Sequence, residues 1–170
     1  RMNYITFANN ARIMIEPIHL PNQQIQQFFS QMLMFWTGIS RDSSSVLTEQ
    51  KRNTANKMDS LRTIRNLAEE LRETVLKKFD AEAFGKILHK GWEHKRKLAG
   101  GVSSGKIDEW HAKALMSGAY GGKLCGAGGG GFLLFITDKE KLLNLRKSLS
   151  ELTPINVSYE SKGSQIIYVS

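Results

Sequence analysis

The stretch that decides the fold is Gly118-Ala-Tyr-Gly-Gly-Lys-Leu-Cys-Gly-Ala-Gly-Gly-Gly-Gly131, which holds eight of the fifteen glycines. Glycine loses more backbone entropy on ordering than any other residue, so a folded chain accepts the run Gly128 to Gly131 only for a reason. The backbone there must adopt positive φ, or must lie very close to another group. Two interpretations stay open. The backbone N–H groups, with Lys123 beside them, could face a phosphate or nucleotide, or the glycines could allow tight helix–strand packing.

The common nucleotide-binding loops do not fit this stretch. A Walker A loop would continue into Gly-Lys-Ser/Thr, and no such sequence follows the glycines. The pair Gly126 and Gly128 suggests a dinucleotide fingerprint, but that fingerprint follows a strand and opens a helix. Here the loop leads into Phe132 to Thr137, an apolar run of strand length.

Downstream of the loop, the pattern predicts one helix and two closing strands. Asp138 is expected to cap a helix rich in leucine over residues 142–149. Residues 155–160 and 165–169 are predicted as strands joined through a turn at Ser161-Lys162-Gly163.

Upstream, the chain opens with the pattern of a hairpin. Residues 3–8 and 12–18 alternate in polarity and are joined by Asn9-Asn10, because asparagine tolerates the left-handed conformation of tight turns. Pro21 then opens a predicted helix that ends at Gly38. Its apolar face would consist of Ile25, Phe28, Phe29, Met32, Leu33 and Trp36.

Further helices are predicted between Gly38 and the glycine-rich stretch. The expected N-caps are Asp42 or Ser43 for a helix through about Lys57, Asp59 or Ser60 for a long amphipathic helix, Asp80 for a third and Asp108 for a fourth. Five short strands around these helices predict an α+β fold, in which a helical insertion lies on one side of a mainly antiparallel sheet.

The composition is that of an ordinary globular domain and excludes disordered and collagen-like chains. The 170 residues are 41% hydrophobic and carry 24 basic against 16 acidic side chains, a net charge of +8. The single Cys125 excludes an internal disulfide. No segment approaches the ~20 apolar residues of a membrane span, so we expect a cytoplasmic protein without a membrane partner.

The charge surplus does not predict a nucleic-acid partner. The aromatic residues fall on predicted helical core faces and do not alternate with basic residues on one surface. The run His94-Lys95-Arg96-Lys97 points in four directions on a helix, which leaves either a solvated helix end or a phosphate-facing role. No metal site is predicted, because His19, His89, His94 and His111 lack metal-ligand spacing.

Residues 121–132, Gly-Gly-Lys-Leu-Cys-Gly-Ala-Gly-Gly-Gly-Gly-Phe, resemble the third motif of the GHMP small-molecule kinases. The segments Leu33-Met-Phe-Trp-Thr-Gly-Ile-Ser-Arg41, Trp92-Glu-His-Lys-Arg-Lys-Leu98 and Met2-Asn-Tyr-Ile-Thr-Phe are similar to the heptose 7-phosphate kinase subgroup of that family. The resemblance implies a ferredoxin-like C-terminal kinase domain over residues 1–170. It also implies ATP and a sugar phosphate as ligands, with Mg²⁺ bound largely through the nucleotide phosphates.

The resemblance also implies roles for individual residues. Gly126, Ala127, Gly128, Gly129, Gly130 and Gly131 would border the ATP phosphates. Arg41 would grip the phosphate of the sugar, assisted by Ser40, Thr37 and Lys123, because an arginine can form two parallel hydrogen bonds to a phosphate.

One departure from the family qualifies this expectation. The Gly-Leu-Gly-Ser-Ser phosphate loop of the N-terminal half is not found in the sequence, and the expected catalytic base would lie upstream of residue 1. We therefore expect an N-terminal ATP-cradling domain to join in cis or trans, and the chain to be inactive alone. The alternative is a non-catalytic α+β module that binds a ligand or partner.

Overall fold

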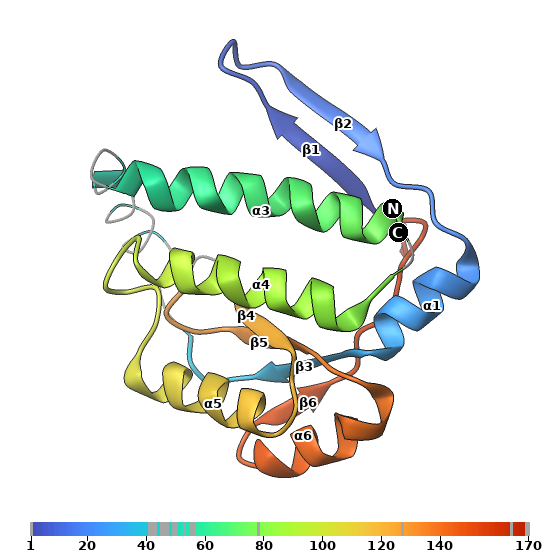
Figure 1. Cartoon of the computed structure of the whole chain (residues 1–170), viewed down its shortest axis with the longest axis vertical. Helices are drawn as coiled ribbons and strands as arrows, with labels where there is room; N and C mark the ends of the chain where they lie inside the picture. The colour runs from blue at the N-terminus through green and yellow to red at the C-terminus, as the bar shows by residue number, and fades with distance from the viewer. Residues whose placement is uncertain are drawn as a thin grey trace.

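The computed structural model describes residues 2–40, 44, 48, 51–52, 54, 57–77, 79–126, 128–163 and 165–168 (Figure 1). Its strands are β1 (Asn3–Phe7), β2 (Ile13–Pro17), β3 (Met32–Trp36), β4 (Gly121–Cys125), β5 (Phe132–Ile136) and β6 (Thr153–Ile155). Its helices are α1 (Asn22–Ser30), α3 (Met58–Leu76), α4 (Ala81–Arg96), α5 (Gly105–Met116) and α6 (Leu142–Ser148), with a 3₁₀ turn at Lys139–Lys141. Within these residues, no helix is both long and apolar enough to cross a membrane.

The main sheet has four antiparallel strands in the order β4-β5-β3-β6. Along the chain, β3 is followed by helices, then β4, β5, α6 and β6. This is the β-α-β-β-α-β connection of a ferredoxin-like domain, with several helices at the first crossover. The predicted α+β fold with a helical insertion is confirmed. β1 and β2 form a separate hairpin, as the sequence predicts.

Both faces of the main sheet are covered by helices. Leu33 and Phe35 of β3, with Leu133 and Phe135 of β5, are buried in the core on the α5 and α6 side. Alternate residues such as Met32 and Ile136 join a second core with aromatic residues from α1 and the start of α4. Figure 1 shows α3 and α4 on one side of the sheet and α5 and α6 on the other. The second core contains Phe28, Val75, Phe79, Ala81 and Phe84.

The predicted continuous helix from Pro21 to Gly38 is wrong. The helix ends at Ser30, and Met32–Trp36 is the strand β3, bonded on one side to β5 and on the other to β6. Large apolar residues on consecutive positions fit a buried strand as well as a helix face. The pairing strands lie about a hundred residues downstream, so the local pattern does not contain the deciding interaction.

The glycine-rich stretch is not wholly a loop, because Gly121–Cys125 forms the edge strand β4. Its glycines fit where side chains would not. A Cβ on Gly121 would meet the carbonyl oxygen of Gly85, and a Cβ on Gly122 would meet the ring of Phe135. The tight helix–strand packing left open by the sequence is therefore present at this strand.

Other boundaries are partly as predicted. Asp80 caps α4 by accepting hydrogen bonds from the N–H groups of Glu82 and Ala83. Ser104, and not Asp108, caps α5. Asp138 does not cap a helix, because its carboxylate contacts Tyr120 and Lys141 instead.

The two predicted closing strands are also wrong in extent. β6 covers only Thr153–Ile155, and no strand occurs in residues 156–163 or 165–168. The long amphipathic helix is confirmed as α3, but it begins at Met58, so Asp59 and Ser60 lie inside the helix and do not cap it. The predicted caps Asp42 and Ser43 lie outside the described residues.

Candidate phosphate-loop site

The loop between β4 and β5, residues 126–131, is held from behind by the segment that follows β3. Thr37 is buried, and its hydroxyl donates to the carbonyl oxygen of Gly131 at 2.8 Å. The same hydroxyl lies 3.2 Å from the Gly131 N–H and 3.3 Å from the Ile39 N–H, which both can donate to it. The Thr37 N–H also donates to the Gly131 oxygen at 2.9 Å. One threonine thus fixes the end of the loop.

The same segment, at Ile39, and the segment before α5, at Val102, also contact the loop through the backbone. The N–H of Gly129 donates to Val102, and the N–H of Gly131 donates to Ile39, both at 2.9 Å. A Cβ on Gly128 would lie 2.8 Å from the Val102 Cα, and one on Gly130 would lie 2.4 Å from the Ile39 oxygen. Gly128 also has φ +123°, which L side chains rarely adopt. Glycine is therefore required here by both space and conformation.

Some backbone N–H groups of the loop donate hydrogen bonds within the protein, and others do not. Gly129 and Gly131 donate inward, while no partner from the described residues engages the N–H groups of Gly126, Gly128 and Gly130. An anion-binding concavity would need such uncommitted donors. Among the described residues of the loop, the N–H groups of Gly126, Gly128 and Gly130 are therefore the candidate donors to an anion.

Lys95 of α4 contacts the loop, and Lys123 of β4 lies close enough to Lys95 for the two charges to interact. Lys95 donates from Nζ to the carbonyl oxygen of Gly126 at 2.5 Å. Burial, and then the charge of Lys123, lower the pKa of Lys95 below its ordinary value. Burial raises the pKa of the nearby Cys125 thiol, although both lysines oppose that rise. No carboxylate from the described residues pairs with either lysine, so their charge is available to an anion.

The four side chains of the basic run at the end of α4 point in different directions, as the helix geometry requires. Lys95 reaches the loop, whereas Arg96 pairs with Glu93 at 2.9 Å and with Asp108 at 3.1 Å. His94 Nδ1 lies 3.5 Å from the Ser60 hydroxyl, and Lys97 is exposed. The solvated helix end describes Lys97, while the phosphate-facing role stays a prediction, for which Lys95 is the candidate. Within the described residues, no cluster of three or more His, Cys, Asp or Glu side chains could hold a metal ion.

A family model described as GHMP kinases C terminal matches residues 67–154, just over half of the chain. The chain belongs to this family. The match includes α4, α5, β4, the glycine loop and β5, so the loop, Lys95 and Val102 lie within the matched part, whereas Thr37 and Ile39 precede it.

Relatives of this GHMP kinase domain include sugar kinases. The D-glycero-alpha-D-manno-heptose 7-phosphate kinase of Campylobacter jejuni is 28% identical over 149 residues, covering 86% of this chain and 44% of the relative. A solved putative sugar kinase from Campylobacter jejuni is 26% identical with a TM-score of 0.68, covering 95% of this chain and 46% of that one. The chain thus spans less than half the length of these relatives.

A third comparison shows the fold alone. The solved D-glycero-D-manno-heptose 1-phosphate kinase from Bacteroides thetaiotaomicron is 20% identical with a TM-score of 0.64, covering 91% of this chain and 40% of that one. The fold is therefore shared over most of this chain.

The structure of this GHMP kinase domain brings together only some of the site residues predicted from the sequence. Gly126 and Gly128–Gly131 form one loop, with half-buried Lys123 beside it. Ser40 is exposed, and the Thr37 hydroxyl is already engaged by the loop, so the roles of both in substrate binding stay predictions. Arg41 and Ala127 lie outside the described residues. Sequence reasoning missed Lys95 as a loop contact, because only the packing of α4 on β4 brings it there.

Proposed function

We propose that this chain supplies the C-terminal half of an ATP-dependent kinase that phosphorylates a sugar phosphate of the heptose 7-phosphate type. Family membership and the relation to heptose phosphate kinases support the reaction class. The observation that carries the proposal is the β4–β5 loop, which is fixed by Thr37, Ile39 and Val102 and contacted by Lys95, whose charge interacts with that of Lys123.

The chemistry of phosphoryl transfer explains why such a loop is useful. Charge spreads over the oxygens of the transferring group, and catalysis consists mainly of positioning and electrostatic stabilisation. N–H donors that are already fixed need no reorganisation when that charge develops. The N–H groups of Gly126, Gly128 and Gly130 would supply donors, and Lys123 would supply a positive charge. ATP would bring Mg²⁺ bound largely through its phosphates.

The substrate phosphate needs a cation of its own. Arg41 remains our candidate because its guanidinium can hold a phosphate with two parallel hydrogen bonds. We refer to this chain joined to the N-terminal half that the proposal requires, in cis or in trans, as the complete kinase. In it, Arg41→Ala should raise KM for the sugar phosphate and change KM for ATP little, while Arg62→Ala on exposed α3 changes neither.

The test is ATP-dependent ADP release by the complete kinase with D-glycero-D-manno-heptose 7-phosphate. The same heptose without its 7-phosphate is the matched control substrate. We expect kcat/KM to be at least about a hundredfold higher for the phosphorylated sugar, because a site built to pair a phosphate loses that pairing with the control. Equal rates on both sugars would contradict phosphate recognition. Binding of either ligand without turnover would instead support a non-catalytic binding module.

A further inference from the structure

The β1–β2 hairpin has one strongly apolar face. Ile5 lies opposite Ile15 and Phe7 lies opposite Ile13, and directly opposed residues of an antiparallel pair share a face. The exposed fractions of these four side chains are 47% for Ile5, 62% for Ile15, 74% for Phe7 and 58% for Ile13. Four large apolar side chains are thus gathered on one exposed surface, which we call the outer hairpin face.

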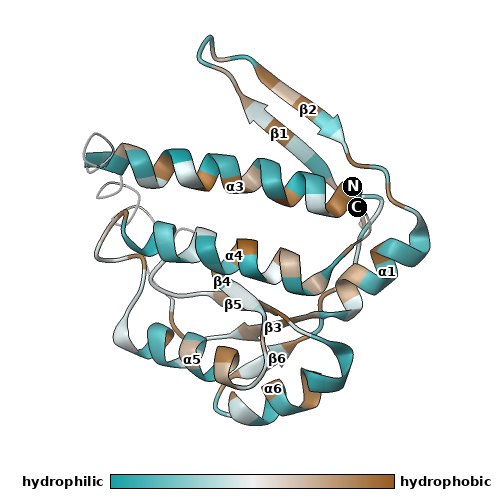
Figure 2. Ribbon diagram, viewed as in Figure 1, coloured by the Kyte–Doolittle hydropathy of each residue, from teal (hydrophilic) through white to brown (hydrophobic). Residues whose placement is uncertain are grey.

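The opposite face is the one held against the domain. Tyr4 lies opposite Glu16 on that face, and Arg72 of α3 contacts both. Arg72 forms an ion pair with Glu16, and its guanidinium carbon lies 5.1 Å from the centre of the Tyr4 ring. The hairpin therefore turns its outer face away from α3. Figure 1 shows it projecting beside α3, and Figure 2 shows the hydrophobic residues along it.

This arrangement reverses the usual amphipathic order. A half-buried antiparallel ribbon normally places its apolar face on the core and its polar face in water. A lone two-stranded hairpin is also only marginally stable, and its unpaired edges invite another strand. Neither edge of the hairpin pairs with another described strand. The hairpin therefore has the properties of a surface that is covered in the working protein.

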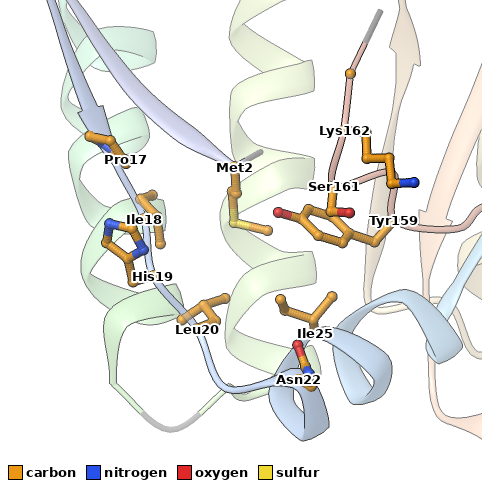
Figure 3. A pocket seen from close by; sticks show the side chains of 11 residues that line it. Met2, Pro17, Ile18, His19, Leu20, Asn22, Ile25, Tyr159, Ser161 and Lys162 are labelled. Carbon is orange, nitrogen blue, oxygen red and sulfur yellow. The ribbon is translucent and has the colours of Figure 1, made fainter. Parts of the chain in front are cut away.

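An open cavity of ≈ 900 Å³ continues this surface at the base of the hairpin. Figure 3 shows Met2, Ile18 and Leu20 on the hairpin side of the cavity and Tyr159 opposite, its ring directed toward Met2. The segment that follows Tyr159 carries the exposed side chains of residues 166–168. Met2 and residues 159–163 thus border one cavity, whose lining mixes apolar residues with polar ones such as His19 and Lys162.

We propose that the outer hairpin face and this cavity form the surface against which the N-terminal half of the kinase packs. The inference rests on the proposed function. The relatives indicate which segment covers the surface. This chain spans 44% of the Campylobacter jejuni heptose 7-phosphate kinase and 46% of the solved putative sugar kinase, so more than half of each lies outside the match. A partner half of that size, preceding residue 2, would meet the chain at the hairpin.

The first experiment compares hydroxyl-radical labelling of Phe7, Ile13 and Ile15 in the 170-residue chain and in the complete kinase. We expect labelling to fall at least about fivefold in the complete kinase, because these side chains are then buried. Labelling of Leu143, exposed on α6, should stay the same and serves as the internal control. Equal labelling of the hairpin in both proteins would overturn the proposal.

The second experiment uses the double variant Ile5→Lys with Ile15→Glu, because opposite charges on directly opposed strand residues do not repel each other. It should lower the Tm of the complete kinase by at least about 4 °C and leave the Tm of the 170-residue chain nearly unchanged, since a charged side chain is costly only where it is buried. Leu143→Lys should change neither. An equal fall in Tm in both proteins would show that these side chains already stabilise the 170-residue chain, and it would contradict the proposal. A wild-type 170-residue chain that sediments as a dimer, and a monomeric double variant, would assign the face to a second copy.

Kinase activity in the same samples separates this inference from the proposed function. An active complete kinase with an unprotected hairpin overturns the docking surface alone. A protected hairpin in a complete protein that turns over no sugar phosphate overturns the proposed function and leaves the docking surface supported.

Discussion

Gly121 and Gly85 lie backbone to backbone, so close that a Cβ on Gly121 would stand 1.8 Å from the carbonyl oxygen of Gly85. This contact joins α4 to the edge strand β4, which leads directly into the glycine loop between β4 and β5. It also fixes α4 so that Lys95, three turns along the helix, reaches the loop at Gly126. The position of the site thus depends on two residues without side chains.

Gly121→Ala should destabilise the chain by about 3 kcal/mol, because the added methyl group cannot fit without separating the helix from the strand. Urea unfolding followed by circular dichroism measures this. Gly105→Ala is the matched control, since a Cβ at that helical position meets nothing within 4 Å. It should leave stability unchanged or raise it by up to about 1 kcal/mol. Similar midpoints for Gly121→Ala and the wild type would contradict the packing described.

Thr37→Val keeps the shape of the side chain and removes the hydroxyl that binds Gly131 and Ile39. We expect a loss of about 1–3 kcal/mol, because buried backbone groups lose their partner. Limited proteolysis within residues 126–131 should also become faster. Thr153→Val, on the exposed strand β6, should change stability by less than about 0.5 kcal/mol. A loop equally resistant to protease in Thr37→Val would show that this hydroxyl does not hold it.

Lys95→Met removes the charged hydrogen bond to Gly126 and also removes the cost of burying a cation near Lys123. Since these effects oppose each other, stability of the 170-residue chain should change by less than about 1 kcal/mol. In the complete kinase, by contrast, we expect KM for ATP to rise about tenfold, because the loop loses a contact at its first residue. Exposed Lys97→Met is the control. Unchanged KM for ATP in Lys95→Met would remove Lys95 from the site.

His111 predicts how stability depends on pH. Its ring is buried, with Nε2 3.1 Å from the Gly122 oxygen and the ring stacked on those of His89 and Trp92. Burial is the main cause that lowers the pKa of His111, and His89 and Arg96 lower it further, while the Gly122 hydrogen bond and Glu93 oppose the shift. The unfolded chain therefore binds this proton first as the pH falls.

The free energy of unfolding should consequently decrease as the pH drops below about 6.5, by up to about 1.4 kcal/mol per pH unit, until the lowered pKa of the folded state is reached. Above about 6.5 this residue contributes no pH dependence. His111→Gln should flatten the decrease, while His19→Gln, at an exposed position, should keep the wild-type profile. A profile with the same slope in His111→Gln would assign the pH dependence to other groups.

Local sequence signals were sufficient where an element depends on its own residues. Asp80 marks the start of α4, Asn9-Asn10 marks the hairpin turn, and the spacing of Leu61, Ile64, Leu67 and Leu71 marks α3. The α+β fold class follows from these elements and from the apolar run of β5.

Local signals failed where distant residues decide. The local pattern of Met32–Trp36 fits a helix face, and only the hydrogen bonds to β5 and β6 make it a strand. Gly121–Cys125 has little strand propensity, and its packing against Gly85 and Phe135 overrides that propensity. For the site, the glycine run was visible in the sequence. Lys95 and the structural role of Thr37 were not, because both depend on contacts across more than 30 residues.

The central claim is that this chain is the C-terminal half of a sugar-phosphate kinase and needs its N-terminal half for turnover. The most direct measurement is ATP-dependent phosphorylation of D-glycero-D-manno-heptose 7-phosphate by the complete kinase and by the 170-residue chain, side by side at equal concentration. We predict turnover by the complete kinase and at least about a thousandfold lower kcat/KM for the chain alone, because positioning of ATP supplies much of the rate. Comparable turnover by the 170-residue chain, or none by the complete kinase, would contradict the claim.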